Sequence, residues 1–272
     1  MLDKILDFIR EAGDFALGNQ SKIDFATSKL KSAKNSDVVT TTDLEISRRF
    51  AKFVHDNFAK LDYVIVDEES VANLGENPMA EIKKHEFAFI IDPIDGTLCY
   101  ANHLPYFGIS IGVFRGGKPY CGAVFCPALR LLTYADEKNA FIEENGNQRK
   151  LETIRETASL YANSFYDAVK ENRQLSKRLN VSALSLYSAV VNATYVATGQ
   201  LRCYGSQCYL WDVAGMYPVF AKIGVEIFNA TTGKKEDLFS EETFTEKLKF
   251  REPFIVCAPK YLADFRELFE LS

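Results

Sequence analysis

The stretch FAFIIDPIDGTLCY, residues 87–100, runs from an apolar segment directly into two aspartates. Residues 87–91 predict a strand that is buried on both faces. Asp92 and Asp95 at the end of such a strand would repel each other and lose hydration unless an opposite charge offsets theirs. A bound divalent cation would supply that charge. A turn rich in Asp, Pro and Gly is the alternative, and the rest of the chain has to decide between the two.

The composition is that of a soluble globular protein. The chain has 272 residues, 47% of them hydrophobic and 25% charged, which fits one large domain or two closely packed halves. The net charge is -5 and the basic residues are scattered, which argues against a nucleic-acid surface. An anionic substrate would therefore need local attraction from metal ions or helix N-termini.

The sequence also gives expectations about location and cysteines. No apolar run approaches the roughly 18 residues of a membrane span, and residues 1–17 predict an amphipathic helix rather than a signal peptide. We therefore expect a cytoplasmic protein that does not bind membranes and keeps its six cysteines reduced. Cys121 and Cys126 fall on opposite faces of a predicted strand, so we expect buried thiols there rather than a zinc cluster with Cys203 and Cys208.

The order of helices and strands predicts two α+β halves of one integrated domain, residues 1–150 and 151–272. The first half combines two helices with an antiparallel sheet, at helices 2–18 and 43–59 and strands 63–66, 87–91, 109–114, 120–126, 131–136 and 140–146. In the second half strands alternate with helices, which predicts strands sandwiched by helices. Its predicted strands are 160–165, 183–187, 202–205, 225–230 and 254–259, and its predicted helices are 166–179, 189–199 and those that begin at 211 and 260.

Three acidic groups follow strands or open helices. Residues 67–69 come after a strand, Asp92 and Asp95 after another, and Asp212 lies in the first turn of a helix. Taken singly they are compatible with a solvated loop, an Asp-Pro turn and a helix N-cap. Taken together, oxygen ligands without a His or Cys pattern select Mg²⁺, Mn²⁺ or Ca²⁺.

Phosphate chemistry is the interpretation that accounts for most of these residues. Gly96 and Thr97 would expose backbone N–H groups beside the aspartates at the start of a short helix. Metals, a hydroxyl and backbone donors around one point describe the hydrolysis of a phosphate ester. The chain has neither a Walker loop nor a G-x-G-x-x-G fingerprint, and its aspartates are three apart rather than two as in haloacid-dehalogenase enzymes. We interpret His103 as local structure rather than as a general base.

Three motifs resemble the signatures of the inositol monophosphatase family: DPIDGT at 92–97, EES at 68–70 and WDVAG at 211–215. The likeness extends in the family's order to 37–50, 104–114 and 192–199. It implies a Mg²⁺-dependent, lithium-sensitive phosphatase with two or three Mg²⁺ ions, or Mn²⁺ in their place. It also implies an α+β fold, a five-layered α-β-α-β-α sandwich of the sugar-phosphatase type, and a homodimer.

The resemblance assigns roles residue by residue. Thr97 and Glu68 would orient a metal-activated water, and Asp43 would hold Thr97 by a hydrogen bond. Asp37 falls in the family's mobile loop, where a weaker metal would bind. The metal ligands would be Glu68, Asp92, the carbonyl of Ile94, Asp95 and Asp212. The substrate contacts would be Asp95, Gly96, Thr97, Ser188, Ala189 and Asp212.

Several departures from the family pattern leave the substrate open. Cys99 stands where relatives usually have Asn, Asp67 replaces a common Gly, and Tyr187 stands where many relatives have Gly. We find neither the glutamate of inositol-selective members nor the DGTK version typical of bisphosphate nucleotidases. Pro218 should bend or break the helix that begins at 211. Inositol phosphate, histidinol phosphate, fructose 1,6-bisphosphate, other sugar phosphates and nucleotide phosphates all stay possible.

Two non-enzymatic interpretations compete with the phosphatase. One is a regulator that binds metal or phosphate and has lost turnover, and the other is structural Ca²⁺ binding. A chain that had lost turnover would be expected to lack at least one ligand, whereas all four carboxylates and Thr97 are present. Structural Ca²⁺ would leave Thr97 and Gly96 without a role. The assembled set of residues therefore favours the enzyme.

Overall fold

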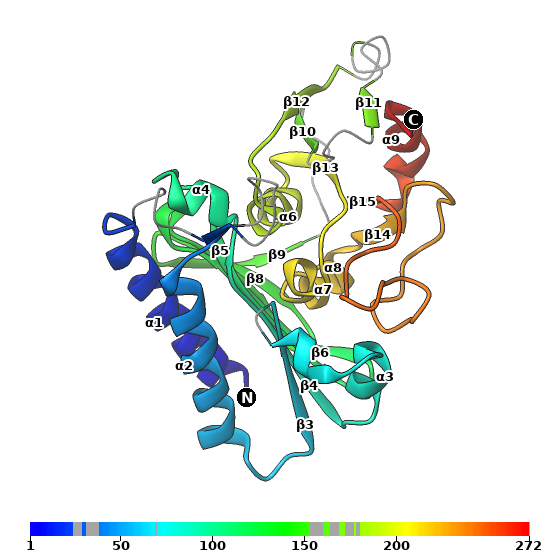
Figure 1. Ribbon diagram of the computed structural model, residues 1–272. Helices are drawn as coiled ribbons and strands as arrows, with labels where there is room; N and C mark the ends of the chain where they lie inside the picture. The colour runs from blue at the N-terminus through cyan, green and yellow to red at the C-terminus, as the bar shows by residue number, and fades with distance from the viewer. Residues whose placement is uncertain are drawn as a thin grey trace.

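The computed structural model describes residues 1–23, 29–30, 38–68, 70–152, 160–163, 169–171, 177 and 180–271. Two sheets and three groups of helices alternate in five layers (Figure 1). This confirms the predicted α-β-α-β-α sandwich. Asp37 and Glu69 lie outside the described residues.

The first layer is a pair of helices, α1 (Leu2–Gln20) and α2 (Thr41–Phe58). Both pack on one face of the larger sheet through an apolar cluster that includes stacked Phe58 and Phe89. Thr40 caps α2, and Asp43 completes a capping box by accepting the Thr40 backbone N–H. The two predicted helices are thus confirmed, with shifts of about two residues at their ends.

The second layer is a seven-stranded sheet in the order β3-β4-β5-β6-β7-β8-β9. Only β3 and β4 pair in parallel, and the other neighbours are antiparallel. The last strand, β9, was not expected from the sequence. The bounds are β3 Tyr63–Asp67, β4 Phe87–Asp95, β5 Gly108–Arg115, β6 Lys118–Cys126, β7 Leu131–Ala135, β8 Ala140–Glu144 and β9 Asn147–Leu151.

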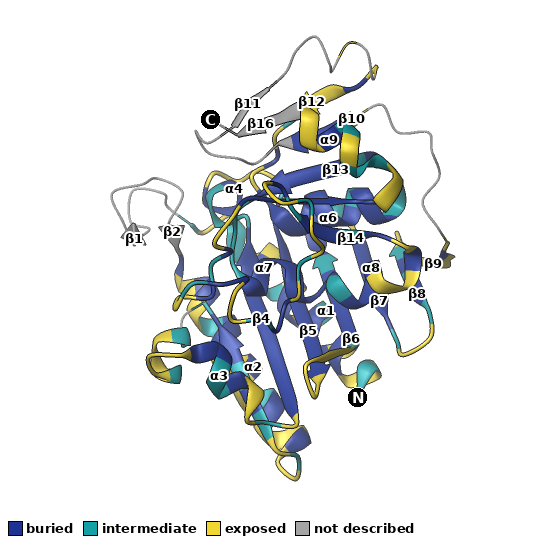
Figure 2. Ribbon diagram, turned by 90° about the vertical axis from the view of Figure 1, so that its right-hand side faces the viewer, coloured by how far each residue is buried: buried dark blue, intermediate teal, exposed yellow. Residues whose placement is uncertain are grey.

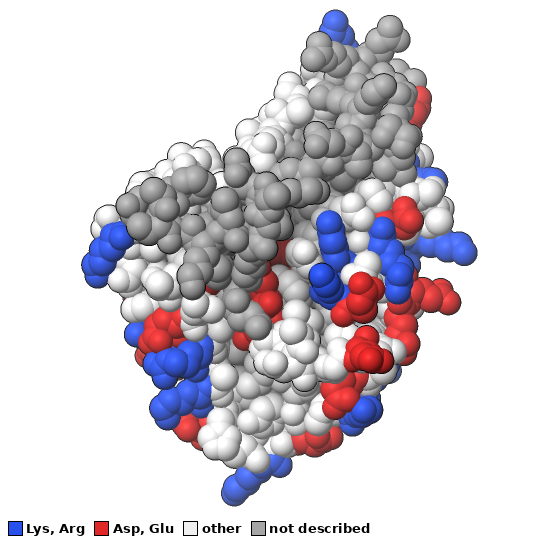
Figure 3. All heavy atoms as spheres, viewed as in Figure 1, with Lys and Arg blue, Asp and Glu red and all other residues white. Residues whose placement is uncertain are grey.

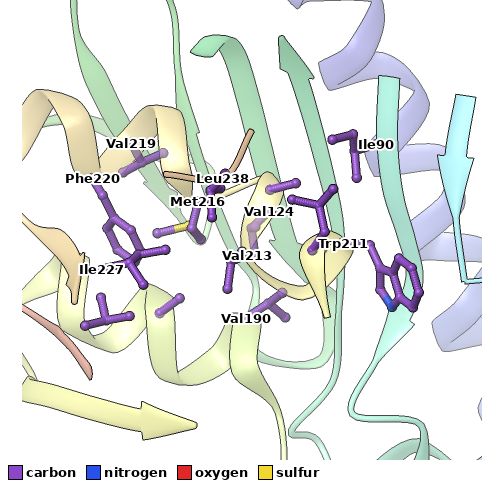
Figure 4. Close-up of a cluster of buried hydrophobic side chains, with 14 of the residues drawn as sticks. Ile90, Val124, Val190, Trp211, Val213, Met216, Val219, Phe220, Ile227 and Leu238 are labelled. Carbon is purple, nitrogen blue, oxygen red and sulfur yellow. The ribbon is translucent and has the colours of Figure 1, made fainter. Parts of the chain in front are cut away.

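The middle layer consists of α6 (Ala189–Thr198), α7 (Leu210–Ala214) and α8 (Tyr217–Ile223). Pro218 lies in the first turn of α8, so the predicted break of the helix begun near 211 is confirmed. These helices join the two sheets through one continuous apolar cluster (Figure 4). Strand β4 is consequently buried throughout, and β5 and β6 are buried over most of their length (Figure 2).

The fourth layer is a five-stranded sheet in the order β12-β10-β13-β15-β14, and the fifth is α9 (Leu262–Leu268), whose Phe265 packs against Tyr161. The predicted helix over 166–179 is wrong for Val169–Glu171, which form β11 and pair with β16 (Phe269–Leu271), while Lys177 is helical. The pairing partner lies about 100 residues away, so no local pattern could indicate it. The other bounds are β10 Leu160–Asn163, β12 Ser182–Leu184, β13 Leu201–Ser206, β14 Glu226–Asn229 and β15 Phe254–Cys257.

Short elements complete the fold. The strands β1 (Lys29–Leu30) and β2 (Val38–Val39) pair with each other. The short helices are α3 Pro78–Lys83 and α4 Thr97–Ala101, with 3-10 turns at Val71–Leu74, Pro127–Leu129 and Pro259–Tyr261.

Two further expectations can be compared with the structure. All six cysteines are free, and Cys121 and Cys126 belong to the apolar clusters on opposite faces of the large sheet, as predicted. Among the described residues, no helix combines the length and the apolar character needed to cross a bilayer.

Candidate metal centre and active site

Asp92 and Asp95 both lie at the buried end of β4, with 2% and 6% of their surface exposed. Asp92 pairs with Ser110 of β5, and the register shifts before Asp95. Pro93 has no N–H to give to the ladder, which explains an irregularity at this point. The Ile94 N–H then turns inward and donates to Asp92 Oδ1 at 3.0 Å. The irregularity therefore brings two carboxylates to the same strand end.

Asp212 reaches these two carboxylates from the middle layer. It occupies the third position of α7, and its Oδ2 accepts the Tyr209 N–H at 2.6 Å. One oxygen from each of Asp92, Asp95 and Asp212 lies within 4.8 Å of the others. The two sequence motifs that carry these residues, 92–97 and 211–215, thus converge in space.

The three carboxylates form an acidic centre that is destabilised without a counter-ion. Burial, followed by the charge of Asp212, raises the pKa of Asp95 to about 8. Burial and the neighbouring carboxylates raise the pKa of Asp92 well above its usual value, and burial raises that of Asp212. A divalent cation would stabilise the ionised forms, and its hard oxygen ligands are already assembled. The donor set therefore fits Mg²⁺ or a similar cation.

Asp95 also caps helix α6. Its carboxylate accepts the Ser188 hydroxyl, the Ala189 N–H at 3.2 Å and the Val190 N–H at 3.0 Å. A negative charge at this position is favourable, because unpaired N–H groups and the helix dipole converge there. Ser188 and Ala189, which the sequence proposed as substrate contacts, consequently lie against a carboxylate of the acidic centre.

Gly96 connects β4 to α4 in a conformation that requires glycine. Its φ is +81°, and a Cβ at this position would lie 2.6 Å from the Tyr106 carbonyl oxygen and 3.0 Å from Ser188 Cβ. Thr97 follows as the first residue of α4, and its hydroxyl lies 2.8 Å from the Ile94 carbonyl oxygen and 3.4 Å from Asp43 Oδ1. The structure thus brings Thr97 close to Asp43, although the shorter contact is to Ile94.

Asp43 is a wholly buried carboxylate beside Thr97. It accepts the Thr40 N–H at 3.0 Å and the Thr40 hydroxyl. Burial raises its pKa to about 7, in spite of these hydrogen bonds, and the charge of Glu68 adds to the rise. Glu68 follows β3 and also raises the pKa of Asp92, so it lies within electrostatic reach of both carboxylates. Among the described residues, Glu68 is outside the cluster of Asp92, Asp95 and Asp212.

The three unusual residues of the sequence have distinct surroundings. Cys99 is buried and its thiol donates to the Leu186 carbonyl at 3.3 Å. Asp67 is buried, and its Oδ1 accepts the Ser70 N–H at 2.5 Å, so that oxygen is used by its own turn. Tyr187 has a φ of +52° and is 47% exposed. It therefore holds the left-handed conformation that glycine adopts without strain.

Ser110 was not among the residues that the sequence singled out. Its hydroxyl donates to the Trp211 carbonyl at 3.0 Å and accepts the Gly215 N–H at 3.1 Å. The available signal was a lone serine inside the apolar strand sequence GISIGVF. A buried hydroxyl in such a strand needs a partner, but the sequence could not say which.

The space-filling view shows acidic side chains in a recess near the middle of this face of the molecule (Figure 3). With this geometry in place, comparison with known proteins identifies the family. The family model described as "Inositol monophosphatase family" matches residues 3–263.

The chain belongs to the inositol monophosphatase family. It is therefore a phosphatase, a phosphoric monoester hydrolase, as the sequence predicted.

Individual relatives are similar over most of the chain. A fructose-1,6-bisphosphatase/inositol-1-monophosphatase from Thermotoga maritima is 28% identical over 250 residues, 88% of each chain. The 3'(2'),5'-bisphosphate nucleotidase CysQ of Escherichia coli is 24% identical, over 90% of this chain and 96% of that protein. The solved structure of an IMPase from Thermotoga maritima has a TM-score of 0.74 at 23% identity and covers 98% of this chain and 95% of its own. That structure supports the layered fold.

Proposed function

We propose that this member of the family hydrolyses a small phosphomonoester in a Mg²⁺-dependent reaction, by direct attack of water and without a phosphoenzyme. The observation that carries the proposal is the convergence of Asp92, Asp95 and Asp212 beside Gly96 and Thr97. Buried carboxylates that are already assembled favour a hard cation, and the adjoining turn presents a hydroxyl and backbone N–H groups to a phosphate.

Each residue of the site would have one or more roles in metal binding, water activation or substrate binding. Asp92, Asp95, Asp212, Glu68 and the Ile94 carbonyl would hold the metal. When bound, Mg²⁺ lowers the pKa of an attacking water and neutralises phosphate charge. Thr97 and Glu68 would orient that water, with Asp43 holding Thr97. Gly96, Thr97, Ser188, Ala189, Asp95 and Asp212 would contact the substrate.

The substrate class is proposed from the names of the relatives. Inositol phosphate, fructose 1,6-bisphosphate and adenosine 3′,5′-bisphosphate are esters of the kinds that those names indicate. Histidinol phosphate and other sugar phosphates belong to the same chemical class, because each presents one phosphate on an alcohol. We also propose that the protein works as a homodimer in the cytoplasm, that it binds two or three Mg²⁺ or Mn²⁺ ions, and that lithium inhibits it.

Phosphate release across a panel of esters tests this proposal. The panel contains inositol 1-phosphate, histidinol phosphate, fructose 1,6-bisphosphate, a hexose phosphate and adenosine 3′,5′-bisphosphate. Each compound is assayed with Mg²⁺, with a chelator, and with Mg²⁺ plus lithium. We expect Mg²⁺-dependent turnover of one compound well above the others, and its loss with lithium. Protein that binds Mg²⁺ and hydrolyses none of these esters would instead indicate a regulator that has lost turnover.

A further inference from the structure

A row of side chains crosses the large sheet beneath α7. Asp92 of β4 pairs with Ser110 of β5, Ser110 with Val124 of β6, and Val124 with Thr133 of β7. Directly paired residues share a face of the sheet, so this row continues from the acidic centre. Val124 belongs to the apolar cluster that also contains Val213 of α7 (Figure 4). Ser110 therefore separates Asp92 from the apolar part of that interface.

The Ser110 hydroxyl contacts α7 on both sides of Asp212. It donates to the carbonyl of Trp211, the residue before Asp212, and accepts the N–H of Gly215, the residue that ends the helix. Trp211 and Gly215 are four residues apart, the spacing of a direct helical hydrogen bond, and the hydroxyl bridges these two groups. Ser110 is wholly buried, so water does not compete for them.

Helix α7 needs such an external anchor. It has five residues, too few to be stable as an isolated helix. Its end lies directly on the sheet: a Cβ on Gly215 would lie 2.7 Å from Ser110 Oγ, and a Cβ on Gly112 would lie 2.6 Å from the Ala214 carbonyl carbon. The absence of these side chains permits the close approach, while the Ser110 hydrogen bonds define where along β5 the helix rests.

We infer that Ser110 is a positioning residue of the metal centre, which holds α7 so that Asp212 meets Asp92 and Asp95. This inference rests on the proposed function, because it assigns Ser110 a role toward the metal that those carboxylates would bind. Without the hydroxyl, the Gly215 N–H would either keep only its contact to the Val213 carbonyl or bond directly to the Trp211 carbonyl. Either change moves the helix end relative to β5, and Asp212 with it.

The experiment compares two hydroxyl deletions in the same row. Ser110→Ala removes the bridge to α7. Thr133→Val removes a buried hydroxyl that has no hydrogen-bond partner among the described residues, so it is the matched control. Mg²⁺ binding to the metal-free proteins is measured by calorimetry, and hydrogen exchange is measured over residues 210–216. Ser110→Thr keeps a hydroxyl and tests whether that group alone restores Mg²⁺ affinity. If Ser110→Ala does not fold, Ser110→Cys is used in its place.

We expect the Mg²⁺ dissociation constant of Ser110→Ala to rise on the order of tenfold, as for other changes to residues that orient metal ligands. Exchange over 210–216 should accelerate in the same variant. Thr133→Val should match the wild type in both measurements, and Ser110→Thr should recover much of the affinity. Equal Mg²⁺ affinity in Ser110→Ala and Thr133→Val would overturn the inference and leave the proposed function intact. Wild-type protein that binds no Mg²⁺ would overturn the proposed function, and the inference with it.

Discussion

Asp95 serves both the acidic centre and the docking of helix α6. Its oxygens accept the Ser188 hydroxyl and two backbone N–H groups, while they remain close to Asp92 and Asp212. Asparagine has the same shape and keeps one oxygen acceptor for the helix, but it lacks the charge that a cation requires. Charge and shape can therefore be separated at this position.

Asp95→Asn should abolish Mg²⁺-dependent phosphate release while the protein stays folded. Loss of an outer-shell partner commonly costs 10–100-fold, so we expect loss of a direct ligand to reduce kcat by about 100-fold or more. Steady-state kinetics at several Mg²⁺ concentrations measure the effect, and circular dichroism checks the fold. Wild-type rates at saturating Mg²⁺ would contradict the assignment.

Thr97 offers a test of the hydroxyl itself. Thr97→Val keeps the shape and removes the group that lies 2.8 Å from the Ile94 carbonyl and 3.4 Å from Asp43. We expect kcat to fall on the order of 100-fold with little change in KM, because the hydroxyl would orient the attacking water, while the backbone N–H of Thr97 stays available to the phosphate in the Val variant. Thr97→Ser, which retains a hydroxyl, should keep most of the activity. Similar rates for the Val and Ser variants would rule out this role.

At the scale of the elements, the contact between α7 and strand β5 decides how the second half of the chain reaches the site. Gly112→Ala would place a methyl group 2.6 Å from the Ala214 carbonyl carbon, so the backbone of α7 has to move. We expect a loss of about 1–3 kcal/mol in the free energy of unfolding, as for other overpacked positions, together with weaker Mg²⁺ binding. Chemical denaturation and calorimetry measure the two effects.

Gly18→Ala is the matched control for that substitution. Gly18 lies in α1, and an added Cβ would meet nothing within 4 Å. Alanine should stabilise this helix by up to about 1 kcal/mol and leave Mg²⁺ binding unchanged. If Gly112→Ala were as well tolerated as Gly18→Ala, the close approach of α7 to the sheet would not hold in solution.

The elements also show how far local sequence patterns reach. Continuous apolar runs and turn residues identified β4 to β8, and Pro218 correctly divided α7 from α8. Local sequence patterns did not predict the pairing of β11 with β16, since it depends on a partner distant in the chain. At the candidate site, the sequence singled out Asp92, Asp95 and Asp212, which the structure brings together, because they follow apolar runs or open a helix. Ser110 acts through tertiary contacts and left no such local signal. The predicted division at residue 150 and the homodimer stay predictions.

For the molecule as a whole, the acidic centre makes stability depend on pH and metal together. In the metal-free folded state the pKa of Asp43 is raised to about 7 and that of Asp95 to about 8, from a value of 3.8. The unfolded chain thus releases these protons at lower pH than the folded chain does. The contribution of these two groups to the stability of the metal-free fold is fully present below about pH 4, and it is lost as pH rises through 7 and 8.

Metal-free protein should therefore unfold more easily at pH 8 than at pH 5. The loss is several kcal/mol at most, because a shift of one pKa unit corresponds to about 1.4 kcal/mol. Carboxylates with lowered pKa, such as Asp136 beside its turn N–H groups, titrate below this range and do not reverse the trend. Saturating Mg²⁺ should weaken the dependence, since the cation binds the ionised carboxylates of the acidic centre and stabilises the folded state more at pH 8 than at pH 5. The part that comes from Asp43, which is not a proposed metal ligand, should remain.

Urea unfolding of the protein between pH 5 and pH 8, with a chelator or with Mg²⁺, measures both effects. Asp95→Asn provides the internal control, because it removes one of the raised groups: its metal-free form should lose less stability toward pH 8, and Mg²⁺ should stabilise it less. Metal-free wild type that is more stable at pH 8 than at pH 5 would mean that the buried carboxylates are already neutralised by groups of the protein itself. Mg²⁺ would then not be needed to hold Asp92, Asp95 and Asp212 together, and the assignment of the acidic centre as a metal site would fail.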